Sequence, residues 1–332
     1  FFMLLAAAVL PIFLAVFLMT GFKVSPGKAL PISFLLSFFA ALFLWKIPVP
    51  DLLSCTLLGA LKSLDIILII SFAIFLLNTL RESGALSTIK NSFSGISADQ
   101  RIQTVIIAWF FGGFIEGVSG FGAAPALAAP LLVSLGIPPV PAVAAAMICN
   151  TITVPFGAVG TAFLAACSTV SESVINNGMT PETFNREAIQ QFSTFAGCIG
   201  IFVPLLAVAM VILLSGDKRK FRSIAEIAPF CLFSGLIYVI PWKLIAVFMG
   251  PELPSVLASL IAFPVLFLAL KIKFLVPARI WTFQQDSVSV QPVSAAEDSG
   301  IPRWKAWMPY LFIALFLVIT RLPVLQVGGW LT

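Results

Sequence analysis

The sequence predicts an all-α integral membrane protein, folded as a polytopic helical bundle. Of its 332 residues, 60% are hydrophobic and only 10% are charged, and the mean hydropathy is +1.09. Soluble domains carry about 25% charged residues, so this balance indicates a lipid environment. The apolar runs are long and lack the ten-residue alternation of a membrane barrel, which favours helices. The net charge of +5 comes from Lys and Arg in short connections and does not indicate nucleic-acid binding.

A helix needs about 20 apolar residues to cross a bilayer. Residues 1–20 are apolar throughout and have no basic segment ahead of them, so we interpret them as a membrane helix and not as a signal peptide. A transmembrane domain is predicted over 1–280, a flexible polar cytoplasmic linker over 281–306, and a further helix within 307–332. The stretches that approach spanning length are 1–20, 29–45, 64–80, 189–214, 226–246, 253–270 and 307–320.

The distribution of basic residues orients this layout. The connections that share one predicted side hold 14 of the 19 Lys and Arg residues. The positive-inside rule places that side in the cytoplasm, so the protein is predicted to lie in the cytoplasmic membrane. The layout is consistent only if residues 102–170 cross the membrane an odd number of times, as three passes or as one pass with a re-entrant hairpin. The connections on the basic side are 21–28, 81–101, 215–226 and 271–306.

Two segments within 102–170 break any helix that runs through them. They are Gly136-Ile137-Pro138-Pro139 and Val154-Pro155-Phe156-Gly157. The triplet Phe121-Gly122-Ala123 also recurs as Phe156-Gly157-Ala158, each time with a proline nearby. Broken helices at membrane depth are tolerated only where the freed backbone groups face protein or a water-filled cavity, and transporters bind substrates at such breaks. We therefore predict discontinuous helices around a substrate site.

Glu116 is the only charged residue between Ile102 and Ser171. A lone carboxylate costs about 2.5–3.5 kcal/mol or more at the centre of a bilayer, which favours a functional role for it. When protonated, Glu116 no longer repels an anion and can donate a hydrogen bond. An anionic substrate and a proton can then enter as a nearly neutral pair, so Glu116 is the predicted proton-coupling residue.

This region contains no Lys or Arg, so an anion must be held by backbone N–H groups, helix N-termini and hydroxyl groups. Two alternatives stay open. The glycines of Gly113-x-x-x-Gly117 also suit close packing between helices, and Asn150 serves equally well as an interhelical hydrogen-bonding residue. The substrate-binding candidates are Gly117, Ser119, Gly120, Gly122, Asn150, Thr151 and Gly157.

The sequence offers no pattern for metal or cofactor chemistry. It has no histidine, and the spacing of its five cysteines fits neither a metal site nor a disulfide framework. Glu116 also lacks an evident partner for nucleophilic catalysis. We therefore expect no metal, no cofactor and no enzymatic activity. The cysteines, expected to be small packing residues, are Cys55, Cys149, Cys167, Cys198 and Cys231.

The motif residues Gly113–Ala123, Asn150-Thr151 and Phe156–Gly160 give the chain a family resemblance. It resembles the L-lactate permease family, whose members are cytoplasmic-membrane symporters of L-lactate, glycolate or another 2-hydroxy monocarboxylate with protons. The resemblance implies inverted repeats and re-entrant hairpins. The family's chain continues through a second half, whereas this sequence ends at Thr332, so it is expected to be the first half of an inverted-repeat transporter.

Other functional interpretations remain open at this stage. One is a passive carboxylate channel in which Glu116 is a selectivity element. Another is a non-transporting fragment or assembly partner of a split permease, with a second-half polypeptide or a second copy of the chain as its partner. The sequence departs from the family pattern at Ala124 and at Ile152-Thr153, which leaves the choice of monocarboxylate open.

Overall fold

The computed structural model describes residues 2–85, 88, 96–120, 122–216 and 219–283, and residues 301, 302, 304–309, 312, 315 and 316 near the C-terminus. All regular elements among these residues are helical, which confirms the predicted fold class. Within this part of the chain, five helical segments are long and apolar enough to cross a membrane. They are Pro26–Phe43, Gln100–Ser119, Pro181–Leu213, Lys220–Met249 and Pro254–Lys271.

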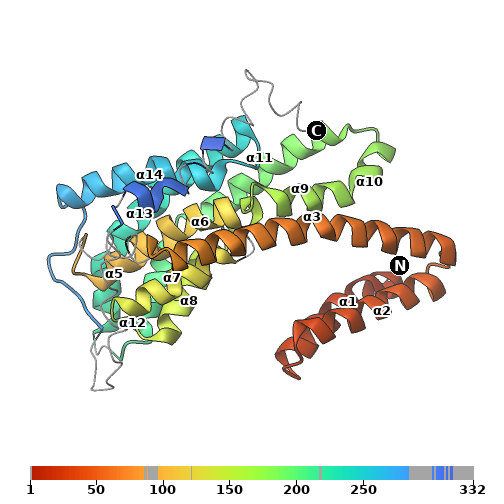
Figure 1. Cartoon of the computed structure of the whole chain (residues 1–332), viewed down its shortest axis with the longest axis horizontal. Coiled ribbons are helices and arrows are strands. Elements are labelled where there is room, and N and C mark those ends of the chain that lie inside the picture. The colour runs from red at the N-terminus through yellow and green to blue at the C-terminus, as the bar shows by residue number, and fades with distance from the viewer. Residues whose placement is uncertain are drawn as a thin grey trace. The chain divides into compact units, whose positions relative to one another are not determined.

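The chain divides into two units, and the first comprises Phe1–Leu68. In it, α1 (Phe2–Thr20) and α2 (Pro26–Phe43) lie side by side, as Figure 1 shows. The next helix, α3 (Val49–Glu82), has 34 residues and is much longer than the span predicted over 64–80. It continues because no proline follows Pro50 within it, and because its apolar residues favour a helix throughout.

The second unit comprises Ile69–Thr332. Its core contains a fully buried helical segment, Gln100–Ser119. This rod consists of α5 (Gln100–Thr104), the π-helix η1 (Val105–Phe111) and α6 (Gly112–Ser119). After the rod comes α7 (Ala123–Ser134), with Gly122 as its N-cap residue. We call the three consecutive segments the α5–α6 rod, and all of its residues are buried.

The rod is followed by α7 and then by a second helix that packs on it. After α7, a turn leads into α8 (Pro139–Asn150), and the side-chain amide of Gln100 donates to the carbonyl of Leu135 across 2.8 Å. This bond places the α7–α8 turn beside the start of the rod. Figure 1 shows α6, α7 and α8 running alongside one another, and which of these segments cross a membrane stays a prediction.

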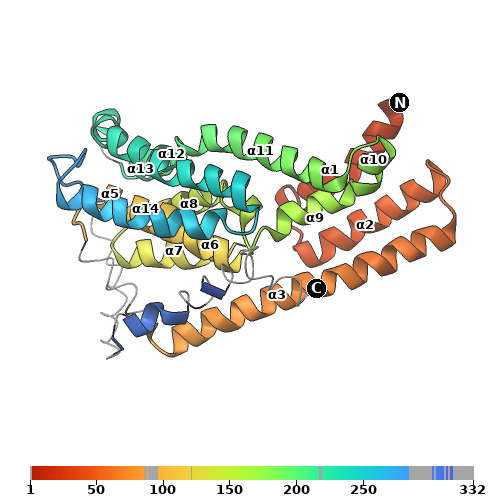
Figure 2. The same cartoon turned by 90° about the horizontal axis from the view of Figure 1, so that it is seen from above.

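Beyond α8, a second break contains the 3-10 turn η2 (Val154–Phe156). The span predicted over 189–214 is divided in two, because the helix ends at Gly200 and restarts with Pro204 in its first turn. Helix α14 packs on α6 and α13, and α12 packs on α8 and α13 (Figure 2). The remaining helices are α9 (Thr161–Thr169), α10 (Ser171–Asn176), α11 (Pro181–Gly200), α12 (Val203–Leu213), α13 (Lys220–Met249) and α14 (Pro254–Lys271).

Aromatic packing fixes the second break in the core. The ring of Phe156 is fully buried and lies 4.9 Å from Trp242, 5.3 Å from Phe163 and 5.5 Å from Phe192, measured between ring centroids. Edge-to-face and tilted pairs at these distances are favourable beyond the burial of their area. Side chains from three helices, α9, α11 and α13, therefore hold the loop between α8 and α9 in place.

The predicted linker over 281–306 is anchored at both of its described ends. Trp281 is only 6% exposed, and its backbone N–H donates to Asp99 across 3.2 Å. Residues 304–309 are helical, and Trp307 packs against Phe111 of the rod at 5.9 Å. Residues 284–300 of the linker, and most of the helix predicted within 307–332, lie outside the described residues.

Candidate functional site

Two interruptions of the helices meet at one place, the end of α6 and the loop after α8, which contains the predicted break at residues 154–157. The other predicted break, at residues 136–139, forms the turn between α7 and α8. The backbone N–H of Ala158, in the loop after α8, donates to the carbonyl of Glu116 across 3.1 Å. The N–H of Val159 donates to the carbonyl of Gly117 across 3.3 Å. The carbonyl of Glu116 also accepts a hydrogen bond from the N–H of Gly120 across 2.8 Å, so the loop after α8 adds a second bond to it and a bond to the carbonyl of Gly117. The structure brings together two segments that are about forty residues apart in the sequence.

This close approach depends on glycine at Gly120. Its φ is +63°, and a Cβ there would lie 2.4 Å from the Cβ of Ala158, far inside van der Waals contact. On the other side, Ala158 and Val159 have φ values of 42° and 59°. Left-handed backbone is unfavourable for a β-branched residue such as Val159. Strain is therefore concentrated where the two breaks meet.

Glu116 lies at the centre of this junction and is 0% exposed. The N–H of Gly122 donates to its Oε1 across 3.4 Å, and the N–H of Ala124 donates to its Oε2 across 3.5 Å. Both donors belong to the start of α7, where the helix dipole favours a negative charge. The Asn150 side chain is a third hydrogen-bond partner. None of the ion pairs found among the described residues includes Glu116.

Asn150 reaches Glu116 from the end of α8 and is only 8% exposed. The hydroxyl of Thr153 donates to the Asn150 side-chain oxygen across 3.3 Å. That bond leaves the amide N–H groups of Asn150 for Glu116. Gly157 completes the junction, since a Cβ there would lie 3.1 Å from Oε1 of Glu116.

The other predicted site residues occupy different positions. Gly117 is covered by α14, and a Cβ there would lie 2.8 Å from the backbone nitrogen of Val256, so this glycine permits helix packing. Ser119 is buried in the last turn of α6, and Gly122 is exposed at the start of α7. Thr151 is exposed, and its hydroxyl donates to the carbonyl of Ile148 across 2.8 Å. The structure therefore does not bring the Thr151 hydroxyl to Glu116.

Sequence reasoning missed a polar group beneath the junction. Tyr238 and Trp242 of α13 are fully buried, and the Trp242 indole donates to the hydroxyl of Ser255 across 3.4 Å. Ser255 in turn donates to the carbonyl of Thr153. A signal was available, because the chain has only two tyrosines and a buried tyrosine usually needs a partner for its hydroxyl.

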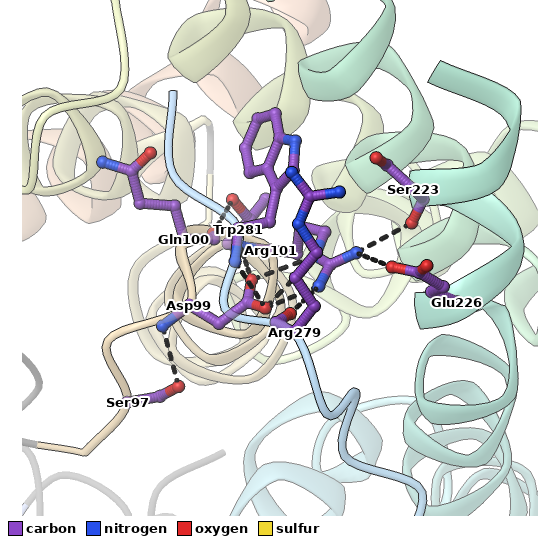
Figure 3. Close-up of polar contacts among 9 residues, drawn as sticks. Ser97, Asp99, Gln100, Arg101, Ser223, Glu226, Arg279 and Trp281 are labelled. Atoms are coloured by element: carbon purple, nitrogen blue, oxygen red, sulfur yellow. Dashed lines mark hydrogen bonds and ion pairs between the residues drawn. The ribbon is translucent and has the colours of Figure 1, made fainter. Parts of the chain in front are cut away.

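Sequence reasoning also missed a second buried ionic group, at the other end of the α5–α6 rod. Figure 3 shows the guanidinium of Arg101 between Asp99, Ser223 and Arg279. Arg101 is 0% exposed and lies 2.7 Å from Asp99, and it donates to the carbonyls of Ser223 and Arg279 across 2.9 and 2.8 Å. Glu226 lies 3.8 Å away. We call these five residues the Arg101 cluster.

The comparisons with known proteins agree with this fold. The family model of L-lactate permease matches residues 4–328. The L-lactate permease of Halalkalibacterium halodurans is 27% identical over 96% of this chain and 57% of its own length. That of Escherichia coli K12 is 28% identical over 95% of this chain and 54% of its own length. The glycolate permease GlcA of Escherichia coli K12 is 27% identical, over 87% and 50% respectively. No solved structure matches the chain.

Long apolar helices, two of them broken around a buried acid, define a multi-pass helical membrane protein. The match over nearly the whole sequence then gives the family, and the chain belongs to the L-lactate permease family. This confirms the resemblance seen in its motifs. The chain spans about half the length of the curated relatives it matches.

Proposed function

We propose that this protein moves L-lactate or a related 2-hydroxy monocarboxylate across the cytoplasmic membrane together with protons, by secondary active transport. The observation that carries the proposal is the position of Glu116, a fully buried carboxyl group at the junction of two helix breaks. The names of the relatives, L-lactate permease and glycolate permease, support the substrate class.

The binding step follows from the donors at the junction. The N–H groups of Gly122 and Ala124, which contact the Glu116 carboxyl, are the kind of donors that a substrate carboxylate needs. An ionised Glu116 competes with the substrate for them and repels it. A protonated Glu116 holds them more weakly and carries no charge. Substrate and proton are therefore expected to bind together.

Further contacts to the substrate are proposed for the backbone of Gly117–Gly122 and Gly157, and for the side chains of Ser119 and Asn150. All of these positions lie at or next to the junction. The exposed hydroxyl of Thr151 supports no such role. The same junction is compatible with a passive carboxylate channel, and also with an assembly partner that needs a second polypeptide or a second copy. Transport measurements separate these functions.

The experiment measures uptake of labelled lactate into liposomes that contain the full protein, with imposed pH or sodium gradients. A pH gradient is expected to drive accumulation in the wild type. Glu116→Gln, which keeps the shape of the side chain but cannot ionise, should abolish this accumulation. The matched control is Glu182→Gln, which alters an exposed glutamate in the first turn of α11 and should transport normally.

Each of the other outcomes contradicts part of the proposal. Flux that only equilibrates lactate indicates a passive channel, and the absence of flux indicates an assembly partner. Accumulation driven only by a sodium gradient would show that sodium, and not the proton, is the coupling ion. If a pH gradient still drives accumulation in Glu116→Gln, Glu116 takes no part in the coupling step.

A further inference from the structure

Helix α13 directs a line of polar side chains into the core of the second unit. They recur at intervals of three, four or eight residues, which places them on one face of the helix. The residues between them on the buried face are apolar, including Ile227, Phe230 and Val239. A row of buried polar side chains is unusual in a helix of this hydropathy, because buried polar groups are costly without partners. The line consists of Ser223, Cys231, Ser234, Tyr238 and Trp242.

The line begins at the Arg101 cluster. The carbonyl of Ser223 accepts a hydrogen bond from Arg101 across 2.9 Å, and Cys231 is the next residue of the line along α13. Glu226 belongs to the same end of α13, and its side chain is 28% exposed. This end therefore has a route to solvent, on the side that the basic residues predict to be cytoplasmic.

The line ends beside Glu116. The hydroxyl of Tyr238 donates to the carbonyl of Ser255 across 3.4 Å and lies 2.6 Å from the position of a Cβ on Gly113, one turn before Glu116. Fifteen residues separate Arg101 from Glu116 and also Ser223 from Tyr238, about 22 Å of helix in each case. The rod and α13 thus meet at both ionic sites, and the polar line connects them.

Two polar atoms in the middle of this path lack partners. Ser234 Oγ and Trp109 Nε1 are buried and have no hydrogen-bond partner among the described residues. Trp109 packs against the ring of Tyr238, with centroids 4.8 Å apart. An unsatisfied buried donor or acceptor costs about 1–3 kcal/mol, and in native proteins such groups usually bind water. The two atoms therefore mark a place where water can enter an otherwise apolar interface.

We propose that the hydroxyl groups of Ser234 and Tyr238, linked by water molecules, form the path along which a proton moves between Glu116 and the Arg101 cluster. This inference rests on the proposed function, since it supplies the route by which the coupling proton leaves Glu116. Each oxygen accepts one proton and releases another, so the path is unchanged after each transfer. The chain has no histidine, so hydroxyl groups and water are the suitable carriers on this route.

The test uses Tyr238→Phe and Ser234→Ala in the full protein, reconstituted in liposomes. Tyr238→Phe removes only the hydroxyl and keeps the ring that packs on Trp109. Two rates are compared, accumulation driven by a pH gradient and exchange of labelled for unlabelled lactate at equal pH. Exchange can proceed with the proton retained on Glu116, whereas accumulation requires the proton to leave. The control is Ser193→Ala on α11, whose buried hydroxyl bonds to the carbonyl of Gln190.

Each variant is expected to slow accumulation about tenfold or more, while exchange stays within about twofold of wild type. Loss of both rates together would indicate a structural role for the hydroxyl and would overturn the path. Unchanged accumulation in both variants would overturn it as well. The proposed function is tested separately by Glu116→Gln, so failure of the path leaves the role of Glu116 intact.

Discussion

Arg101 and Glu116 are both fully buried on the α5–α6 rod, yet their surroundings differ sharply. Arg101 makes hydrogen bonds of 2.7–3.2 Å to Asp99 and two more to backbone carbonyls. Glu116 accepts two backbone bonds of 3.4 and 3.5 Å, and no cation pairs with it in the described part of the chain. A buried charge recovers its desolvation cost only when it is paired and fully hydrogen-bonded. The Arg101 cluster meets that condition, and Glu116 does not.

From this difference we expect the Arg101 cluster to stabilise the fold and Glu116 to serve transport. The Arg101 cluster ties three segments together, because Asp99 and Arg101 lie at the start of the rod, Ser223 lies near the start of α13, and Arg279 follows α14. Within this cluster, the fully bonded Asp99–Arg101 pair has little freedom to change its protonation or position, whereas Glu226 is 28% exposed. Glu116, with long bonds and a strained loop beside it, can change both. Substitutions at the first site are therefore expected to impair folding, and substitutions at the second to impair transport.

The largest effect on stability is expected for Arg101→Ala. It leaves Asp99 buried without its partner, and breaking such a pair typically costs about 3–5 kcal/mol. Thermal unfolding of the detergent-solubilised protein should show a strong drop in the midpoint or no folded protein. The control is Arg222→Ala on α13, whose side chain is 70% exposed and pairs with Glu226. Exposed pairs of this spacing contribute about 0.3–0.5 kcal/mol, so an equal loss in both variants would contradict the comparison.

An intermediate effect is expected at the junction of the helix breaks. Gly120→Ala places a methyl group against Ala158 at a left-handed φ, so the two breaks must separate. We expect a loss of about 2–4 kcal/mol from the clash and the strain, together with loss of lactate uptake. Unfolding and uptake are measured on the same preparation.

Gly112→Ala gives the matched control for that substitution. A Cβ at Gly112 meets its nearest atoms at 3.5 and 3.8 Å, which is ordinary contact. Alanine is favoured over glycine inside a helix by about 0.5–1 kcal/mol, so stability should stay level or rise. A fall of the same size as for Gly120→Ala would show that the rod tolerates no added methyl group, and that the junction is not special.

Much of the fold and part of the site follow from local features of the sequence. Hydropathy predicts most of the helices, and the isolation of Glu116 in an apolar region is enough to mark it as a candidate site residue. The glycine and proline runs predict the turn between α7 and α8 and the break after α8. All of these signals depend on residues close together in the chain, where the cost of a charge or the loss of an N–H group acts directly.

Other features depend on contacts between distant residues and could not be predicted. The bonds from Ala158 to Glu116 and from Arg101 to Ser223 join segments that no local pattern relates. Thr151 was predicted to face the site, but the chain leaves the helix at Asn150, so neighbouring residues point in different directions there. The length of α3 was missed because hydropathy marks only its most apolar part.

The smallest effects distinguish two neighbouring candidates at the junction. Asn150→Ala removes a buried partner of Glu116, and the loss of one such hydrogen bond is worth about 1 kcal/mol. If Asn150 also holds the substrate, KM for lactate should rise about fivefold, the equivalent of that energy. If it acts only between helices, stability should fall while KM stays constant.

Thr151→Ala removes an exposed hydroxyl that bonds to a carbonyl of the preceding helix, so stability should change by less than about 0.5 kcal/mol. KM should then be unaffected, because the hydroxyl faces away from the junction. A raised KM in Thr151→Ala would instead place substrate on the outer side of the second break, and would restore the role that the sequence predicted for this residue.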